Sequence, residues 1–242
     1  MRSPTWTRVL SRPSSFWDSY FSLLGVLLAT LVLFPFVTNR PLVWGVKIAL
    51  VVAAIIISYR ASGSGTQVVT WVTMGALVLG AVLTAAVFSS SNAVAGVVNL
   101  ALAALIGSGP VAILRHVYSE PRVKMHDIVG ALDAYIELGF FFSFLYAAVD
   151  QFAAEPFFSQ TTDPALFDYL YFSFVTMTSL GYGDLSPALA VGKGLVIIEV
   201  LLGSIFLVVL VARLVGTLGM ERPQRPTQPE GNSQAENRDG VA

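Results

Sequence analysis

The sequence predicts an all-α integral membrane protein with six transmembrane helices and a short re-entrant segment between the fifth and the sixth. Mean hydropathy is +0.72, and only 12% of the 242 residues are charged, whereas soluble proteins carry about 25%. Apolar runs close to the roughly 20 residues needed to cross a bilayer recur along the chain. The expected spans are 20–37, 41–59, 67–88, 93–118, 128–149 and 190–218.

Short polar turns separate these runs. A basic N-terminus can belong to a signal peptide, but Tyr20–Val37 is long for one and ends without an Ala-x-Ala site, so we expect a retained first span. In the fourth run, Gly107-Ser-Gly-Pro110 is expected to interrupt the later part of the helix. From Glu221 onward the chain is rich in proline, glutamine and charge and is predicted to be disordered.

Charge and composition limit the classes of function. Most lysine and arginine residues fall on one side of the six expected spans. This predicts a multi-pass membrane protein with both termini cytoplasmic. A plasma membrane, such as a bacterial inner membrane, is its expected location. The chain has no cysteine, two histidines without metal-binding spacing and a net charge of −1. The absence of cysteine and of metal-binding spacing argues against a thiolate metal site and a metal enzyme, whereas the net charge says nothing about a nucleic-acid partner. We expect no enzymatic activity, no cofactor and no nucleic-acid partner.

The stretch between the last two runs needs a separate explanation. Thr178-Ser-Leu-Gly-Tyr-Gly-Asp184 places hydroxyls, glycines and an acid at membrane depth. Such backbone is tolerated there only if it is buried in protein or lines a water-filled path. Asp163 and Pro164 predict the N-cap and first residue of a short helix leading into it. That helix is expected to end near Thr178, with the negative end of its dipole favouring a cation.

Residues 178–184 resemble the selectivity filter of potassium channels, in which backbone carbonyls replace the hydration shell of K⁺. The resemblance implies that K⁺ is the permeant ion and that Tyr182 faces outward against the short helix. It also implies that the K⁺ sites are formed by the Ser179 hydroxyl and by the backbone carbonyls of Ser179, Leu180, Gly181 and Tyr182. Ser179 and Leu180 depart from the family pattern, which has threonine and valine there.

Two consequences follow from that resemblance. Carbonyls that all face one axis need alternating backbone conformations, some with φ > 0, which Gly181 and Gly183 reach without a Cβ clash. One such stretch cannot surround an ion, so we expect a homotetramer in the lipid bilayer. A glycine-rich turn and a phosphate-binding loop are the alternatives for these residues. A phosphate loop would need more glycines, a lysine or a following soluble helix.

The chain looks like a bacterial six-span potassium channel without a charged voltage sensor. The resemblance is specific over about residues 120–217 and loose before them. The fourth run carries only Arg115 and His116 at its end, and weak or absent voltage dependence is expected because sensors need a ladder of arginines. The expected divisions are a cytoplasmic segment (1–19), a four-helix sensor-like domain (20–118), a linker (119–126), a pore domain (127–218) and a disordered cytoplasmic tail (219–242).

Several residues are candidates for supporting the filter. Glu199 is costly inside an apolar span. It is expected to bond the hydroxyl of Ser173, Thr176 or Thr178, to line the cavity, or to be protonated and structural. Gly203 aligns with the hinge glycine of the family, and close packing is the alternative for it. Tyr171 could offer its phenol to Asp184.

The remaining acids form two groups. Asp133 and Glu137 share one face of the fifth span and are expected to pair with basic residues, with simple anchoring as the blander role. The candidate partners are Arg115, Arg122 and Arg213. The second group is expected to concentrate cations at the outer mouth. Its members are Asp150, Glu155, Asp163, Asp168 and Asp184.

Three other functions stay open at this point. Ser179 allows a poorly selective monovalent cation channel. A potassium transporter subunit belongs to a different class, but such proteins usually carry four degenerate loops with one filter glycine each, whereas this chain has one loop with Gly181-Tyr-Gly183. The third is a non-conducting partner that assembles with other pore subunits. The intact stretch of residues 178–184 argues against it.

Overall fold

The computed structural model of the protein describes residues 15–33, 91–119 and 125–218, with isolated positions between 35 and 75. The helices in these parts are α1 (Ser15–Leu33), α4 (Asn92–Ser119), α5 (Met125–Phe152), α6 (Leu166–Met177) and α7 (Ala190–Leu218). Three of them are long and apolar enough to cross a membrane, over Asn92–Arg115, Ile128–Phe152 and Ala190–Arg213. The described helices are those of a multi-pass membrane protein. Only isolated positions of the second and third expected spans are described, and the first 14 residues and the tail after residue 218 lie outside the described residues.

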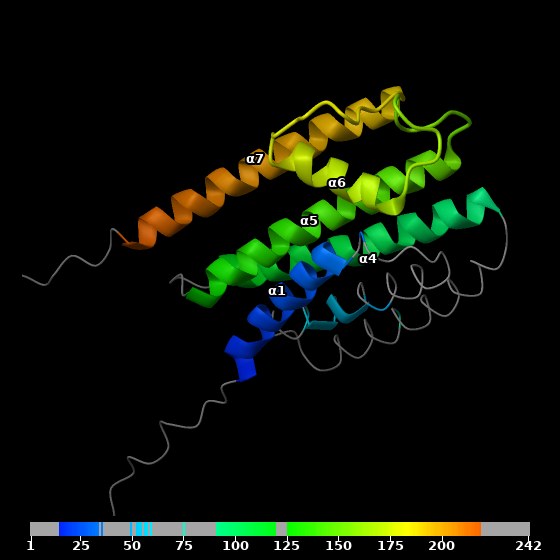
Figure 1. Ribbon diagram of the computed structural model, residues 1–242. Helices are drawn as coiled ribbons and strands as arrows, with labels where there is room; N and C mark the ends of the chain where they lie inside the picture. The colour runs from blue at the N-terminus through cyan, green and yellow to red at the C-terminus, as the bar shows by residue number, and fades with distance from the viewer. Residues whose placement is uncertain are drawn as a thin grey trace, which may run out of the picture.

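Helix α5 is the centre of the arrangement, because α1, α4, α6 and α7 all contact it (Figure 1). α4 runs antiparallel to α5, and glycines on α4 bring the two helices close together. A Cβ atom at Gly96 would lie 2.8 Å from the ring of Phe152, and one at Gly107 would lie 2.8 Å from the ring of Phe141. Small residues of this kind let helix backbones approach each other in membranes.

The interruption expected at Gly107-Ser-Gly-Pro110 is wrong. α4 continues as a helix through Pro110 to Ser119. The glycines are explained by packing instead, since Gly107 accommodates Phe141 and Gly109 accommodates the carboxyl group of Glu137. The glycines that suggested a break in α4 instead leave room for side chains of α5.

The start of α6 also differs from the expectation. The helix begins at Leu166, so Asp163 and Pro164 both precede it. The N-cap is Ala165, whose backbone is extended and whose N–H donates to the Asp168 carboxylate at 2.7 Å. An acid inside the first turn thus satisfies the exposed amide and complements the helix dipole. The end of the helix is as predicted, at Met177 with Thr178 as C-cap.

The α5–α6 loop, residues 153–165, is tied to the chain that follows the glycines. Phe158 and Pro187 form an isolated antiparallel bridge. Beside it, Ser159 N–H donates to Ser186 O at 3.0 Å, and the Gln160 side chain bonds both the backbone N–H and the hydroxyl of Ser186. Aromatic rings anchor the bridge to α5 and α6, in a cluster of Phe142, Tyr146, Phe157, Phe158, Tyr169 and Phe172.

Candidate functional site

The α6–α7 loop, residues 178–189, turns its first amides back onto the end of α6. Ser179 N–H donates to Thr176 O at 2.9 Å. The N–H groups of Leu180 and Gly181 both donate to Val175 O, at 2.9 and 3.3 Å. These bonds satisfy carbonyls that a helix end would otherwise leave without partners. Because N–H and C=O point in opposite directions across a planar trans peptide, the preceding carbonyls point away from α6.

The backbone of this loop alternates in conformation. Ser179, Gly181 and Gly183 have φ of 57°, 55° and 80°, whereas the intervening residues have no positive φ. The prediction for both glycines is confirmed. The positive φ of Ser179 was not anticipated, since the sequence signals such a backbone only through glycine. A β-branched threonine is strongly disfavoured at positive φ, so the unbranched serine suits this position.

The side chains of residues 178–184 are exposed in a single chain. Leu180 is 55% exposed and Tyr182 is 66% exposed. The packing of Tyr182 against the short helix stays a prediction for the assembled protein. The exposure means that one chain presents this loop on its surface instead of enclosing it.

Tyr171 bonds Asp184, as the sequence suggested. The phenol Oη donates to Oδ2 of Asp184 at 2.7 Å, which ties α6 to the far end of the loop. α6 is too short to cross a membrane. The hydrogen bond to Asp184, as the main cause, and partial desolvation, as the second, raise the pKa of Tyr171 to about 12. The raised pKa means that the contribution of the bond to stability is fully present below pH 10 and is lost as the pH rises through about 12.

In the channel that the sequence predicts, replacing Tyr171 with phenylalanine is expected to accelerate the loss of current during sustained conduction, because the loop loses a tie at its far end. The decay rate of the wild-type current should not change between neutral and mildly alkaline pH, where Tyr171 stays protonated. Asp184→Asn and the variant that carries both substitutions complete a double-mutant cycle, in which single-channel recording measures the rate of current decay. We expect the double variant to decay no faster than the more affected single variant. Fully additive effects would contradict a direct bond between the two side chains.

Glu199 lies inside the protein and contacts two hydroxyls. Oε1 lies 2.5 Å from Ser173 Oγ and Oε2 lies 2.5 Å from Tyr146 Oη, and all three residues are fully buried. The predicted bond to Ser173 is confirmed. Thr178 instead donates its hydroxyl to Phe174 O at 2.6 Å. Reasoning from sequence missed Tyr146, because nothing local connects residues 53 positions apart.

Gly203 packs against the end of α6. A Cβ atom there would lie 2.7 Å from Met177 Cγ and 3.0 Å from Met177 O. Tyr135 of α5 reaches the same carbonyl, with its Oη 3.4 Å away. Close packing, one of the two roles considered for Gly203, therefore accounts for the glycine in this conformation. A hinge at this position stays a prediction.

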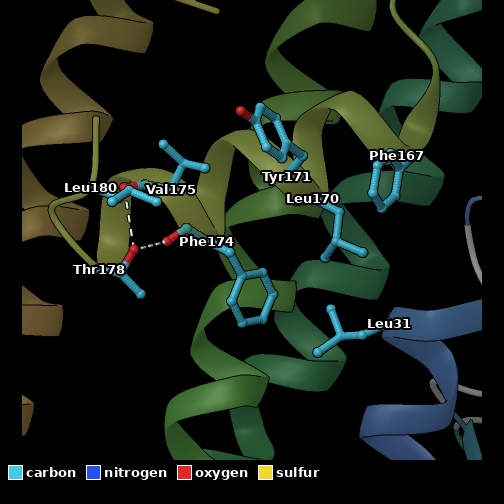
Figure 2. Close-up of a pocket in the computed structure, with 8 residues that line it drawn as sticks. All are labelled: Leu31, Phe167, Leu170, Tyr171, Phe174, Val175, Thr178 and Leu180. Carbon is cyan, nitrogen blue, oxygen red and sulfur yellow. Dashed lines mark hydrogen bonds between the residues drawn. The ribbon is translucent and has the colours of Figure 1, made fainter. Parts of the chain in front are cut away.

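A cavity of about 300 Å³ lies beside the first residues of the loop. Figure 2 shows Thr178 and Leu180 at one end of it and Leu31 of α1 at the other, with α6 side chains between them. The α6 residues that line it are Phe167, Leu170, Tyr171, Phe174 and Val175. α1 thus contributes to the lining of a cavity that reaches the loop, although it is remote in sequence.

The acids expected at the outer mouth divide by their contacts. Asp150 accepts the Phe157 N–H at 2.7 Å, and Asp168 and Asp184 accept the bonds described above. These three acids therefore have structural partners. Glu155 and Asp163 are exposed, and a role for them in concentrating cations stays a prediction.

Asp133 and Glu137 are fully buried in α5. Glu137 packs its carboxyl group against Gly109 of α4. Neither carboxylate oxygen of Asp133 has a hydrogen-bond partner, so its expected pairing with Arg115 or Arg213 is wrong. Arg122, the third candidate, lies outside the described residues. The Glu137 side chain therefore packs against α4, and Asp133 is buried without a hydrogen-bond partner among the described residues.

Comparison with known proteins found a similarity, which covers α5, α6 and α7. Residues 131–219 match a protein-family model described as Ion channel, which spans nearly all of α5, the whole of α6, the loop and α7. The match supports an ion channel of the pore-loop type. No curated protein matches the sequence, and no solved structure matches it. Among the residues that the structure describes, no group of three or more His, Asp or Glu side chains could hold a metal ion.

Proposed function

We propose that the protein is the subunit of a potassium-selective channel that conducts K⁺ passively. The observation that carries the proposal is the backbone of residues 178–183, where φ alternates in sign and successive amides bond α6. Carbonyls then face away from the helix and are available to a dehydrated cation. The K⁺ sites are formed by the carbonyls of Ser179, Leu180, Gly181 and Tyr182 together with the Ser179 hydroxyl. The partially negative end of α6 adds to the attraction for a cation.

Four identical chains surround the axis in this proposal. The surface of α7 supports an assembly, because only 11% of its membrane-length stretch is buried in one chain. Leu201, Ile205 and Val208 follow one another along one side of the helix and are 55%, 58% and 68% exposed. Neighbouring subunits and lipid would cover this apolar face. A ring of four also completes the ion sites that one exposed loop cannot form.

The proposed channel opens without strong voltage dependence. Arg115 and His116 are the basic residues of α4, and both stand near its end. Such a helix lacks the row of charges that a transmembrane potential would move. We place the protein in the plasma membrane of a bacterial cell from its resemblance to bacterial potassium channels, and we place both termini in the cytoplasm from the distribution of basic residues.

The reversal potential of the purified protein tests the proposal. The protein is reconstituted in a planar bilayer with potassium on one side and sodium on the other. We expect reversal near the potassium equilibrium potential and a change of sign when the two solutions are exchanged. A protein-free bilayer is the control. Current that reverses near zero would replace the proposal with a poorly selective cation channel, for which the serine at position 179 would be the first candidate cause.

A further inference from the structure

Glu199 occupies an unusual position on α7. Its neighbours Ile198, Leu201 and Leu202 are 49%, 55% and 45% exposed, whereas Glu199 is completely buried on the side that faces α5 and α6. An ionised carboxylate without a cation partner is costly to bury, but a neutral acid whose hydrogen bonds are all formed is not. The described contacts of this side chain are hydroxyl groups and not cations.

The hydrogen-bond geometry around Ser173 determines how many protons the group must hold. Ser173 Oγ lies 2.8 Å from Gly139 O and 2.5 Å from Glu199 Oε1. A serine hydroxyl has one hydrogen, and a backbone carbonyl can only accept. If Ser173 donates to Gly139, the bond to Glu199 forms only when Glu199 donates the hydrogen. Tyr146 Oη then donates to the remaining oxygen, Oε2. Three bonds require three protons, and the third belongs to Glu199.

We propose that Glu199 is a protonated, uncharged acid that fastens the first half of α7 to α5 and α6 and thereby positions the loop of residues 178–184. The path is short. Glu199 holds Ser173, and two residues further along α6 the Val175 carbonyl accepts the amides of Leu180 and Gly181. Glu199 is a positioning residue, since it does not touch the permeant ion. This role rests on the proposed function, whereas its protonation does not.

The contacts that hold α7 differ on the two sides of Gly203. Before it, Glu199 bonds α5 and α6, and Gly203 itself abuts Met177. Beyond it, the ring of Phe206 packs on Tyr135 of α5, with the centroids 5.5 Å apart. Val208, Val211 and Val215 are 68%, 56% and 62% exposed. In the first half of α7, the link to the helix that supports the loop therefore runs through Glu199.

Glutamine and alanine at position 199 separate the roles of the acid. Glutamine is neutral and similar in shape, and its amide donates to Ser173 while its carbonyl accepts from Tyr146. We expect Glu199→Gln to keep the wild-type reversal potential between potassium and sodium, and Glu199→Ala to shift this potential toward zero. If glutamine behaves like alanine, the group acts as an anion and the proposal is overturned. It is equally overturned if alanine behaves like the wild type.

Infrared spectroscopy of the full-length protein in vesicles reads the protonation directly. The difference spectrum between wild type and Glu199→Gln at neutral pH should contain the C=O stretch of a protonated carboxylic acid. Its replacement by a carboxylate band would overturn the proposal. This readout holds even if the wild type proves unselective, so a failure of the proposed function is distinguished from a failure of this inference.

Single-bond variants cover the case in which Glu199→Ala does not assemble. Ser173→Ala removes the link to α6, and Tyr146→Phe removes only the donor from α5. We expect Ser173→Ala to shift the reversal potential more than Tyr146→Phe, because only the former acts on the helix that supports the loop. Equal shifts would show that the three residues act through general stability and would overturn the positioning role.

Discussion

Alanine in place of Gly181 is expected to abolish potassium-selective current. Gly181 has φ of 55° between residues without positive φ, and an L-residue at such a φ costs about 1–2 kcal/mol. Ser179 already adopts a φ of 57° two residues earlier, so a second strained side chain adds to an existing cost. In the proposed ring of four chains the strain is repeated in every subunit. The backbone can relieve it by rotating peptide planes, which turns carbonyls away from the ion path.

Reversal potential and single-channel conductance measure this result against a matched glycine. Gly194 lies on α7, and a Cβ atom there would meet nothing within 4 Å. Gly194→Ala should assemble and conduct with wild-type selectivity. Gly181→Ala should assemble equally well, as size-exclusion chromatography would show, but should conduct no selective current. Wild-type selectivity in Gly181→Ala would contradict the placement of the ion sites.

Alanine in place of Gly203 is expected to destabilise the protein. The new methyl group would overlap Met177 Cγ and crowd Met177 O, and overpacking of this kind costs about 1–3 kcal/mol. Glycine-to-alanine changes in an open helix position instead stabilise by up to about 1 kcal/mol. Thermal unfolding in detergent should therefore show opposite signs, with Gly203→Ala lower and Gly194→Ala equal to or above the wild type. A Tm for Gly203→Ala at or above the wild type would contradict the packing role.

Met177→Ala added to Gly203→Ala separates packing from bending. Removing the buried Met177 side chain makes room for the new methyl group but costs about 2–5 kcal/mol by itself, so the double variant is compared with Met177→Ala alone. If Gly203→Ala changes neither Tm nor open probability in that background, close packing explains the glycine. If Tm is unchanged there while the open probability is still altered, the second role, a hinge at Gly203, is supported.

The helices were largely predictable because each is a run of apolar residues bounded by polar ones. α5 and α7 begin and end within a few residues of the expected spans. The errors arose where a distant residue decides the outcome. Gly107 and Gly109 indicate a break in isolation, but the structure places side chains of α5 against them. Asp163 and Pro164 have the form of a helix start, yet the carboxylate of Asp168 fixes the start at Leu166.

The site was predictable in its glycines and less so in its partners. Positive φ at Gly181 and Gly183 follows from the chemistry of glycine, whereas serine at position 179 gives no such signal. The bond between Tyr171 and Asp184 could be proposed because both flank one short loop. The contact of Tyr146 with Glu199 joins two separate spans. Periodicity identifies a buried face, but it does not identify which residues across the interface meet.

The pairing between the α5–α6 loop and the chain after the glycines has a practical consequence for labelling. The bridge of Phe158 with Pro187 and the bonds of Gln160 join the α5–α6 loop to the chain that follows the glycines. Thr162 and Asp163 come shortly after this attachment in the α5–α6 loop and are exposed. Exposed loop positions tolerate change well. Since the chain contains no cysteine, a single cysteine at Thr162 would give a fluorophore one attachment point per chain, in a loop that is tied to the segment after the glycines.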